Sequence, residues 1–343
     1  MFISKKNFSK NSIFIAEVGQ NHQGSLSMAK KYVREFSKLG ANIIKFQTRN
    51  NKFLFSKKAY NKKYDSENAF GKTYGQHREK LELSYSELKI LKQECEKNNV
   101  KFMSTPFEEK SLKLLLKLKI DIIKISSFDI GNLSFIEKIA KTKKPIVISI
   151  GGAKIKHIDE SIKMIRKYHS KMILMHCVSQ YPCPLENLDL TNITKLKKRY
   201  PDLIIGSSDH FNGILSGPIA YILGARVFEK HVTFDRSLKG TDHKFSLEPE
   251  GFRKFVRDVK RSHTMLNSKK NKSVGKEPVF LKLGKSVTAR NKIFKGQKIK
   301  LTDLTGTIFE KNYIPIRDTY KVLNKKAKDD IEKDEAISFN QLK

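Results

Sequence analysis

LIIGSSDH at residues 203–210 and ARVFEKHVT at residues 225–233 are two short apolar runs that each reach a histidine. Each run is typical of a buried strand that ends in polar side chains. Between them, residues 213–224, GILSGPIAYILG, are long enough for one helical crossover that a glycine closes. Strands joined in this way are parallel neighbours, so His210 and His231 are predicted to lie at the same edge of one sheet.

His210 and His231 form a candidate metal site. Two neutral imidazoles at adjacent strand ends suit a borderline divalent cation and leave coordination positions open for substrate or water. The alternative interpretation is that the two histidines are unrelated and lie on the surface or in the core. The residues alone leave both interpretations open.

Apolar runs rich in β-branched residues recur along the chain, with amphipathic stretches between them. Eight are recognisable, at residues 13–18, 41–47, 100–105, 120–126, 145–150, 171–178, 203–208 and 225–231. The stretches between them carry helix signals, such as Ser84 with Glu87 three residues later, the pattern of a capping box. Eight alternating units in about 250 residues predict a (β/α)₈ TIM barrel, and a doubly wound open sheet is the competing architecture.

The ends of these runs carry polar side chains, as an active site at the carboxyl ends of barrel strands requires. In chain order they are Glu17; Lys45 and Gln47; Ser104 and Thr105; Lys124, Ser126 and Ser127; Ser149; His176 and Ser179; Ser208, Asp209 and His210; and Glu229, Lys230 and His231. A lysine in a β-branched run is costly to bury without a partner, so Lys45 and Lys124 are predicted to face an anion. In the alternative, each lysine reaches solvent or pairs with Glu17 or Glu229.

The length of 343 residues predicts one large domain and a small one. The barrel is expected over residues 1–262, with its last helix at 249–261, a linker rich in Ser, Asn and Lys at 263–278, and a compact β-rich domain at 279–343. Two similar phrases, IFKG at 293–296 and IEKD at 331–334, fall in this last part.

Composition restricts the classes of partner. The net charge of +34, from 69 Lys and Arg against 35 Asp and Glu, favours anionic small molecules. The chain has no tryptophan and no arginine-rich patch, which argues against specific nucleic-acid recognition. Cys95, Cys177 and Cys183 lack CxxC spacing, residues 1–12 lack the apolar core of a signal peptide, and no apolar run reaches membrane-spanning length. We therefore expect a cytoplasmic protein without a membrane segment.

Motifs at the strand ends resemble those of the sialic acid synthase family, the phosphoenolpyruvate-dependent synthases of nonulosonic acids. They are IAEVGQNHQG at 15–24, IKFQT at 44–48, MSTPF at 103–107, IKISS at 123–127, HCVSQYPCP at 176–184, GSSDH at 206–210 and FEKHVTFDRSLKGTDHKFSLEPE at 228–250. The C-terminal part resembles the antifreeze-like (SAF) domain of that family. The resemblance covers nearly the whole chain.

The resemblance implies that C3 of phosphoenolpyruvate attacks the open-chain aldehyde of an N-acylated hexosamine, that water adds at C2, and that phosphate leaves. It implies a divalent metal, typically Mn²⁺, on His210 and His231, and a homodimer in which the small domain of one subunit covers the partner's barrel. The implied catalytic residues are Glu17, Lys45, His210 and His231; those binding phosphoenolpyruvate are Lys45, Thr105, Lys124, Ser127, Ser149, Ser179 and Ser208; those facing the sugar are Gln47, Asn68, Tyr181 and Asp242.

The chain departs from the family pattern at two places. Residues 149–152 read SIGG where relatives read STGM, so a threonine hydroxyl is missing and the phosphate site is expected to be altered. The family's KRPG phrase, whose arginine reaches the partner's active site, has no match near residues 309–313, FEKNY. Lys311 is a substitute there without the planar fork of arginine.

Two alternatives to the synthase remain. One is a lysine Schiff-base aldolase on the same barrel, with Lys45 or Lys124 as the nucleophile and no metal. The other is a carbohydrate-binding barrel protein that has lost turnover.

Overall fold

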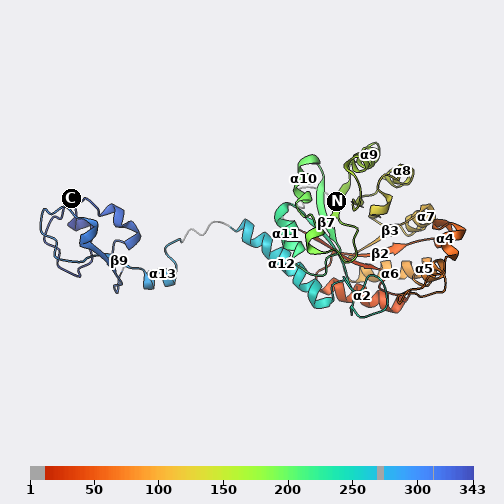
Figure 1. The fold of residues 1–343 in the computed structure, drawn as a ribbon, viewed down its shortest axis with the longest axis horizontal. Helices are drawn as coiled ribbons and strands as arrows, with labels where there is room; N and C mark the ends of the chain where they lie inside the picture. The colour runs from red at the N-terminus through yellow and green to blue at the C-terminus, as the bar shows by residue number, and fades with distance from the viewer. Residues whose placement is uncertain (1–11, 269–273, 312) are drawn as a thin grey trace. The chain divides into compact units, whose positions relative to one another are not determined.

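The computed structural model describes residues 12–268, 274–311 and 313–343. The chain divides into two compact units, Met1–Asn267 and Ser268–Lys343, which are described separately below (Figure 1). The predictions made from residues 1–11, from linker residues 269–273 and from Asn312 concern positions outside the described residues. None of the helices in the described ranges is both long and apolar enough to cross a membrane.

The first unit is a closed barrel of parallel strands (Figure 1). Its strands are β1 (Ile13–Gly19), β2 (Ile43–Thr48), β3 (Lys101–Pro106), β4 (Ile123–Ile125), β5 (Ile146–Ser149), β6 (Met172–Cys177), β7 (Ile204–Asp209) and β8 (Val227–His231). Each strand pairs with the next, and β1 pairs with β8 to close the ring. The (β/α)₈ prediction is confirmed, and the open-sheet alternative is wrong.

Helices between the strands form the outer layer of the barrel. They are α2 (Leu26–Lys38), α6 (Tyr85–Lys97), α7 (Glu109–Lys117), α8 (Leu133–Lys141), α9 (Ile155–Arg166), α10 (Asn192–Arg199), α11 (Ser216–Leu223) and α12 (Pro249–Asn267). Ser84 and Glu87 form the predicted capping box at the start of α6, and Gly224, with φ +115°, ends α11 in the left-handed conformation. Helix α12 ends later than predicted, so the linker expected at 263–278 begins inside it.

Side chains alternate between the two faces of each strand, and this alternation separates the core from the cavity. Ile15, Ile43, Val147 and Val227 belong to an apolar cluster inside the barrel. Two residues further along the same strands, on the same face, come Glu17, Lys45, Ser149 and Glu229. The barrel interior is therefore apolar below and polar at the carboxyl ends of its strands.

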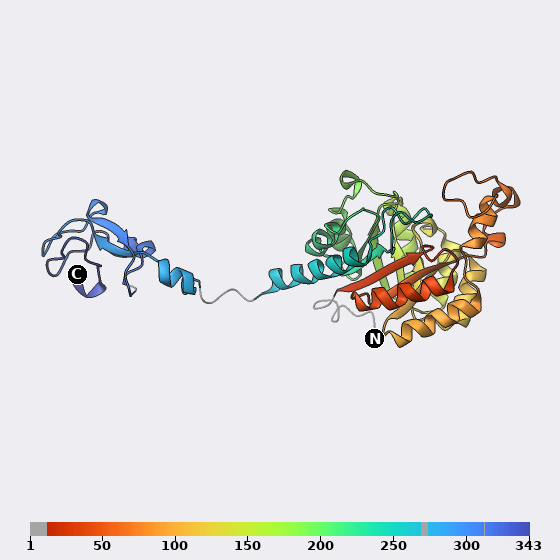
Figure 2. The same cartoon turned by 90° about the horizontal axis from the view of Figure 1, so that it is seen from below.

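One connection is much longer than the others. Residues 49–84, between β2 and α6, contain the short helices α3 (Asn51–Leu54), α4 (Lys57–Asn61) and α5 (Tyr74–Lys80). Figure 2 shows this excursion in orange, projecting at the end of the barrel toward which β1 points. The excursion thus adds a side wall at the carboxyl ends of the strands.

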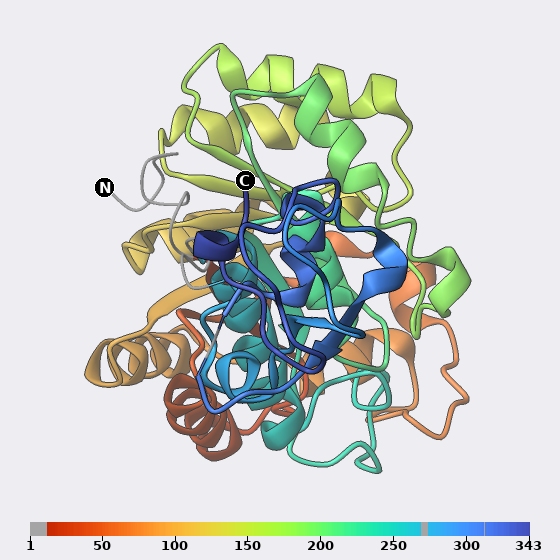
Figure 3. The ribbon, with the colours of Figure 1, turned by 90° about the vertical axis from the view of Figure 1, so that its left-hand side faces the viewer.

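The second unit has a core of its own and is built mostly from turns and short strands (Figure 3). Helix α13 (Pro278–Leu283) precedes the antiparallel pair β9 (Ser286–Ala289) and β10 (Leu304–Thr307), and 3₁₀ turns follow. The two similar phrases of the sequence meet here, because Ile293 and Ile331 form a β-bridge and are both fully buried.

Candidate active site

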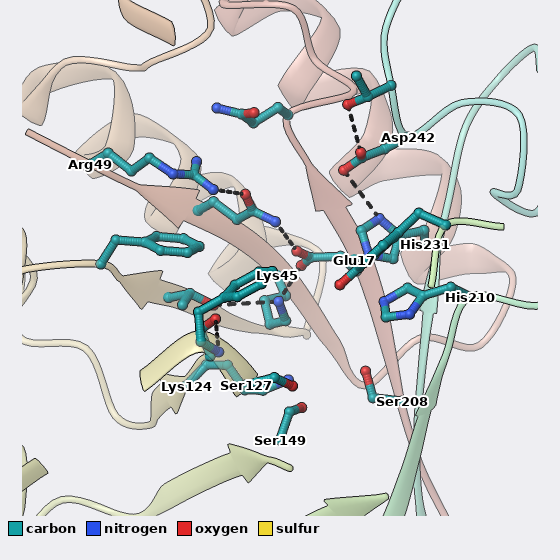
Figure 4. Close-up of a pocket in the computed structure, with 18 of the residues that line it drawn as sticks. Glu17, Lys45, Arg49, Lys124, Ser127, Ser149, Ser208, His210, His231 and Asp242 are labelled. Carbon is teal, nitrogen blue, oxygen red and sulfur yellow. Dashed lines mark hydrogen bonds and ion pairs between the residues drawn. The ribbon is translucent and has the colours of Figure 1, made fainter. Parts of the chain in front are cut away.

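A cavity of about 500 Å³ opens at the carboxyl ends of the barrel strands (Figure 4). The residues that line it are Glu17, Gln20, Lys45, Gln47, Arg49, Tyr64, Asn68, Tyr74, His77, Arg78, Thr105, Phe107, Lys124, Ser126, Ser127, Phe128, Ser149, Cys177, Tyr181, Ser208, His210, Glu229, His231, Thr241 and Asp242. Ser179 is the one residue of those that the family resemblance assigns to catalysis, substrate or metal that is not among them. Four other polar strand-end residues also do not line the cavity: Ser104, His176, Asp209 and Lys230.

Two lysines and two glutamates meet in the centre of the cavity. Lys45 Nζ lies 2.7 Å from Glu17 Oε2 and 3.4 Å from Glu229 Oε1. Lys124 Nζ donates to both oxygens of Glu229, at 3.0 and 2.8 Å. All four side chains are buried. Each lysine faces the cavity, as binding of an anion requires, and each also pairs with a glutamate, as the alternative interpretation predicted.

The two glutamates have different electrostatic environments. Burial alone would raise the pKa of Glu229, but the ammonium groups of Lys124 and Lys45 outweigh it and lower that pKa to about 2. Burial raises the pKa of Glu17 to about 6, because Lys45 and the hydrogen bond from Gln47 offset only part of this effect and the negative charge of Glu229 adds to the rise. Glu229 is therefore ionised throughout the neutral range, whereas Glu17 exchanges a proton near pH 6.

Hydroxyl groups surround the lysine pair. Thr105 Oγ1 accepts from Lys45 Nζ at 3.4 Å, and Ser208 Oγ donates to Glu229 Oε1 at 3.1 Å. The hydroxyl of Ser149 is buried and has no hydrogen-bond partner among the described residues. Ser127 Oγ accepts from the backbone N–H of Gly151 at 3.0 Å.

Two expectations for this region concern Ser179 and Ile150. Ser179 is not among the residues that line the cavity, but its hydroxyl is buried without a hydrogen-bond partner among the described residues, and a Cβ added to Gly151 would lie 2.3 Å from it and 3.1 Å from the hydroxyl of Ser127. The role of Ser179 in binding phosphoenolpyruvate stays a prediction. Ile150, at the position of the missing threonine hydroxyl, points away from the cavity and packs into the core between strands and helices. That departure from the family pattern therefore leaves the cavity wall unchanged.

His210 and His231 lie side by side, with ring centroids 5.3 Å apart. His210 Nδ1 lies 2.8 Å from the carbonyl oxygen of Val178, so this nitrogen carries the proton and Nε2 keeps a lone pair. Burial lowers the pKa of His231 to about 3 and keeps the ring neutral. Its buried Nδ1 has no hydrogen-bond partner in the described part of the chain and lies 3.7 Å from Asp242 Oδ2.

These features fit a metal ion for which the protein supplies only some of the ligands. Neutral imidazoles with a lone pair and a nearby carboxylate are the usual ligands and supporting group of a catalytic divalent cation. Within the described ranges, no group of three His, Cys, Asp or Glu side chains converges closely enough to hold a metal ion. Two protein ligands would therefore be completed by substrate or water.

The residues predicted to face the sugar all line the cavity; they are Gln47, Asn68, Tyr181 and Asp242. Gln47 Nε2 donates to Glu17 Oε1 at 2.9 Å, and Asn68 Oδ1 accepts from the N–H of Gly240 at 2.8 Å. The ring of Tyr181 lies 3.9 Å from that of His210, between centroids. Asp242 accepts from the hydroxyl of Thr241 at 2.8 Å.

Several residues that line the cavity are not predicted from the sequence, and two of them are arginines. The alternation that directs Lys45 and Gln47 inward continues to Arg49, so the strand period itself could have identified this residue. Arg78 lies on α5, in the long excursion, and no strand-end pattern indicates it. The aromatic residues Tyr64 and Tyr74 reach the cavity from the same excursion.

Comparison with known proteins finds relatives that include synthases of sialic acid and of related acids. Residues 32–271 match the NeuB family. The chain is 34% identical over 324 residues to N-acetylneuraminate-9-phosphate synthase of Homo sapiens, covering 94% of this chain and 90% of that protein. It is 35% identical over 301 residues to N,N'-diacetyllegionaminic acid synthase of Campylobacter jejuni, covering 86% and 90%. The crystal structure of N-acetylneuraminic acid synthetase from Leptospira borgpetersenii superposes with a TM-score of 0.68 at 32% identity, covering 78% of this chain and 90% of that one.

Proposed function

Because the chain belongs to the NeuB family, whose members condense phosphoenolpyruvate with a sugar, we propose that its acceptor is the open-chain aldehyde of an N-acylated hexosamine. The observation that carries the proposal is the pairing of two buried lysines with two neutral histidines in one cavity. The lysines suit a trianionic substrate, and the histidines suit a metal that activates an aldehyde.

Phosphoenolpyruvate would bind at the lysine pair. Its phosphate and carboxylate need cations and donors, which Lys45 and Lys124 supply together with the hydroxyls of Thr105, Ser127, Ser149 and Ser208. The hydroxyl of Ser149, for which the described ranges hold no hydrogen-bond partner, can donate to an anion. Ser179, whose buried hydroxyl has no hydrogen-bond partner in the described part of the chain, would supply a further donor beside Gly151 and Ser127.

A divalent cation, which we propose to be Mn²⁺, would be held by His210 and His231. When bound, it would supply Lewis-acid polarisation of the aldehyde oxygen. The carbonyl of Val178 fixes the ring of His210, and Asp242 faces the ring of His231. Gln47, Asn68, Tyr181 and Asp242 would orient the sugar.

Glu17 would handle the protons of the reaction. C3 of phosphoenolpyruvate bonds to the aldehyde carbon, whose oxygen takes up one proton. Water adds at C2 and gives up one proton, which leaves a hydroxyl on C2. The C2 carbonyl then forms as the bond from C2 to the phosphate oxygen breaks, and the hydroxyl proton leaves with the phosphate. A carboxyl group with a pKa of about 6 can give the first proton and accept the second. The amide of Gln47 holds this carboxyl group in place.

We also propose that the protein is a cytoplasmic homodimer. Phe128 and Tyr181, at the cavity, are 75% and 45% exposed, as expected if a partner subunit covers this face. All three cysteines are free and buried, which suits a reducing compartment.

The direct test is inorganic phosphate release from phosphoenolpyruvate, Mn²⁺ and a panel of N-acylated hexosamines, with and without chelator. Release should require both sugar and metal, should be lost in His210→Ala, and should persist in His157→Ala, which removes an exposed histidine on α9. Metal-independent condensation of pyruvate with the sugar, together with inactivation by borohydride in the presence of pyruvate and no release of phosphate, would identify the Schiff-base aldolase. A folded protein that binds Mn²⁺ but neither releases phosphate nor condenses pyruvate with any sugar would be the non-catalytic binder.

A further inference from the structure

The arginines of the cavity have no part in the chemistry described above. Arg49 follows β2 and Arg78 lies on α5, and both side chains line the cavity. Together with Gln20 and Glu82 they form a connected group, here called the arginine wall. Arg78 donates to Gln20 Oε1, and Gln20 Nε2 donates to Glu82 Oε1 at 3.3 Å.

The arginine wall has one carboxylate for two guanidinium groups. Arg49 lies 3.5 Å from Glu82 Oε1, and its side chain is only 8% exposed. Arg78 has no carboxylate within ion-pair distance among the residues that the structure describes. It donates to the neutral Gln20 and, from Nε at 3.1 Å and Nη2 at 2.8 Å, to the hydroxyl of Tyr74. The charge of Arg78 is close enough to help lower the pKa of Arg49. The direct contacts of the Arg78 guanidinium are thus all neutral, and the carboxylates of Glu82 and Asp242 act on it only from beyond ion-pair distance.

Both guanidinium groups are held in fixed orientations. Arg49 lies over the ring of Phe107, 3.8 Å from its centroid, and donates to Gln47 Oε1 at 2.6 Å. Arg78 lies over the ring of Tyr74, 5.1 Å from its centroid. Preorganised planar donors of this kind match the oxygens of a phosphate group and lose little entropy when they bind one.

The arginine wall is separate from the site proposed for phosphoenolpyruvate. Figure 4 shows Arg49 on the far side of Glu17 and Lys45 from Ser149 and Ser208. The hydrogen bonds run from Arg49 through Gln47 to Glu17, so the space beside Gln47, proposed for the sugar, lies next to the wall. An anion at the arginine wall would therefore belong to the acceptor sugar.

We propose that the arginine wall binds a phosphate group on the acceptor, so that the enzyme takes a phosphorylated N-acyl-hexosamine. The phosphate is carried on the end of the sugar away from the aldehyde, which must lie at the histidines. This inference rests on the proposed function, and it makes Arg78 the residue that distinguishes phosphorylated from unphosphorylated acceptors.

The test compares kcat/KM for N-acetylmannosamine with and without a phosphate on C6, in the full-length protein, by product formation from phosphoenolpyruvate. The wild-type enzyme should prefer the phosphorylated sugar. Arg78→Gln should lower the ratio of the two kcat/KM values about 10- to 100-fold, the usual effect of losing hydrogen bonds between charged groups. Lys80→Gln, which removes one positive charge from an exposed position on the same helix, should leave the ratio unchanged.

Four results would overturn the inference. A wild-type ratio of one or less would show that no acceptor phosphate is recognised. An equal loss with both sugars in Arg78→Gln would assign the arginine a structural role. Activity with neither sugar would refute the proposed function as well, whereas activity with the unphosphorylated sugar alone would refute only this inference. If Arg78→Gln does not fold, the inference is tested by the wild-type ratio and by Arg78→Lys, whose ratio of kcat/KM values should lie between that of the wild type and one.

Discussion

Replacing Glu17 with glutamine tests the electrostatics of the cavity directly. Two effects oppose each other at this carboxyl group: Lys45, at 2.7 Å, favours the ionised form, whereas burial and the charge of Glu229 favour the protonated form. The balance raises the pKa of Glu17 from 4.5 to about 6. Glutamine resembles the protonated carboxyl group in shape and lacks the titration.

The sign and size of the effect on stability follow from this pKa. Because the folded state holds the proton more tightly than the unfolded state, the contribution of Glu17 to stability is full below pH 4.5 and is lost as the pH rises through about 6. The gap between these pKa values, at 1.36 kcal/mol per pKa unit, corresponds to about 2 kcal/mol. The wild type should therefore lose about 2 kcal/mol relative to Glu17→Gln between about pH 4 and pH 7.

The assay is guanidinium unfolding of both proteins across this pH range, followed by circular dichroism, with chelator present so that no metal perturbs the group. Glu229→Gln is the matched control, since it makes the same change in the same cluster. The pKa of Glu229 is lowered to about 2, so its contribution is full above pH 4.5 and is lost only as the pH falls toward 2. Because Glu229→Gln also removes the negative charge that helps to raise the pKa of Glu17, the difference between wild type and this variant should fall between pH 5 and pH 7 by no more than the difference between wild type and Glu17→Gln.

A difference between wild type and Glu17→Gln that is constant or grows from pH 4 to pH 7 would refute the reasoning. It would mean that the ion pair with Lys45 outweighs burial and keeps Glu17 ionised. The proposed exchange of protons by Glu17 near pH 6 would then lose its physical basis.

Two further predictions concern substrate binding and packing. Lys124→Met leaves Glu229 with Lys45 alone, and we expect calorimetry to show that phosphoenolpyruvate binds about 10- to 100-fold more weakly to this variant. Lys101→Met, an exposed change outside the cavity, should leave the affinity unaltered. Equal affinities of the wild type and Lys124→Met would contradict the assignment of Lys124. Gly206→Ala would place a Cβ 2.2 Å from Met175 Sδ and 2.7 Å from the carbonyl oxygen of Val227, so the unfolding free energy measured in guanidinium should fall by about 1–3 kcal/mol. Gly251→Ala, whose Cβ would meet only ordinary contacts, should not destabilise, and a similar loss in both variants would contradict the packing argument.

Strand alternation explains why so much of the cavity could be predicted from the sequence. Once Ile15 and Ile43 face the interior of the barrel, Glu17 and Lys45 must face it as well. The register of the closed barrel then places Glu17 opposite Lys45 on one side and His231 on the other. Local periodicity and parallel pairing thus suffice to bring these residues together.

The same reasoning fails where the chain leaves the strands. Arg78 reaches the cavity only because the excursion of residues 49–84 folds back over the barrel mouth, and no short-range pattern encodes that return. Ser179 lies two residues beyond the end of β6, where the alternation no longer applies, so the strand period does not predict the direction of its side chain. The sharing of Glu229 by two lysines is also a property of the closed ring, since β4 and β8 are distant in the sequence.

The sequence's large positive charge does not by itself make the anion site. The cavity is lined by four cationic side chains, Lys45, Arg49, Lys124 and Arg78, against three carboxylates, Glu17, Glu229 and Asp242. The surface lysines that dominate the +34 are screened by solvent, whereas the buried cations act at full strength on whatever enters. Carboxylates already hold the lysines in place, so an arriving phosphate exchanges partners within a preformed cluster. Preorganisation of a few buried charges, and not net charge, therefore determines where each anion binds.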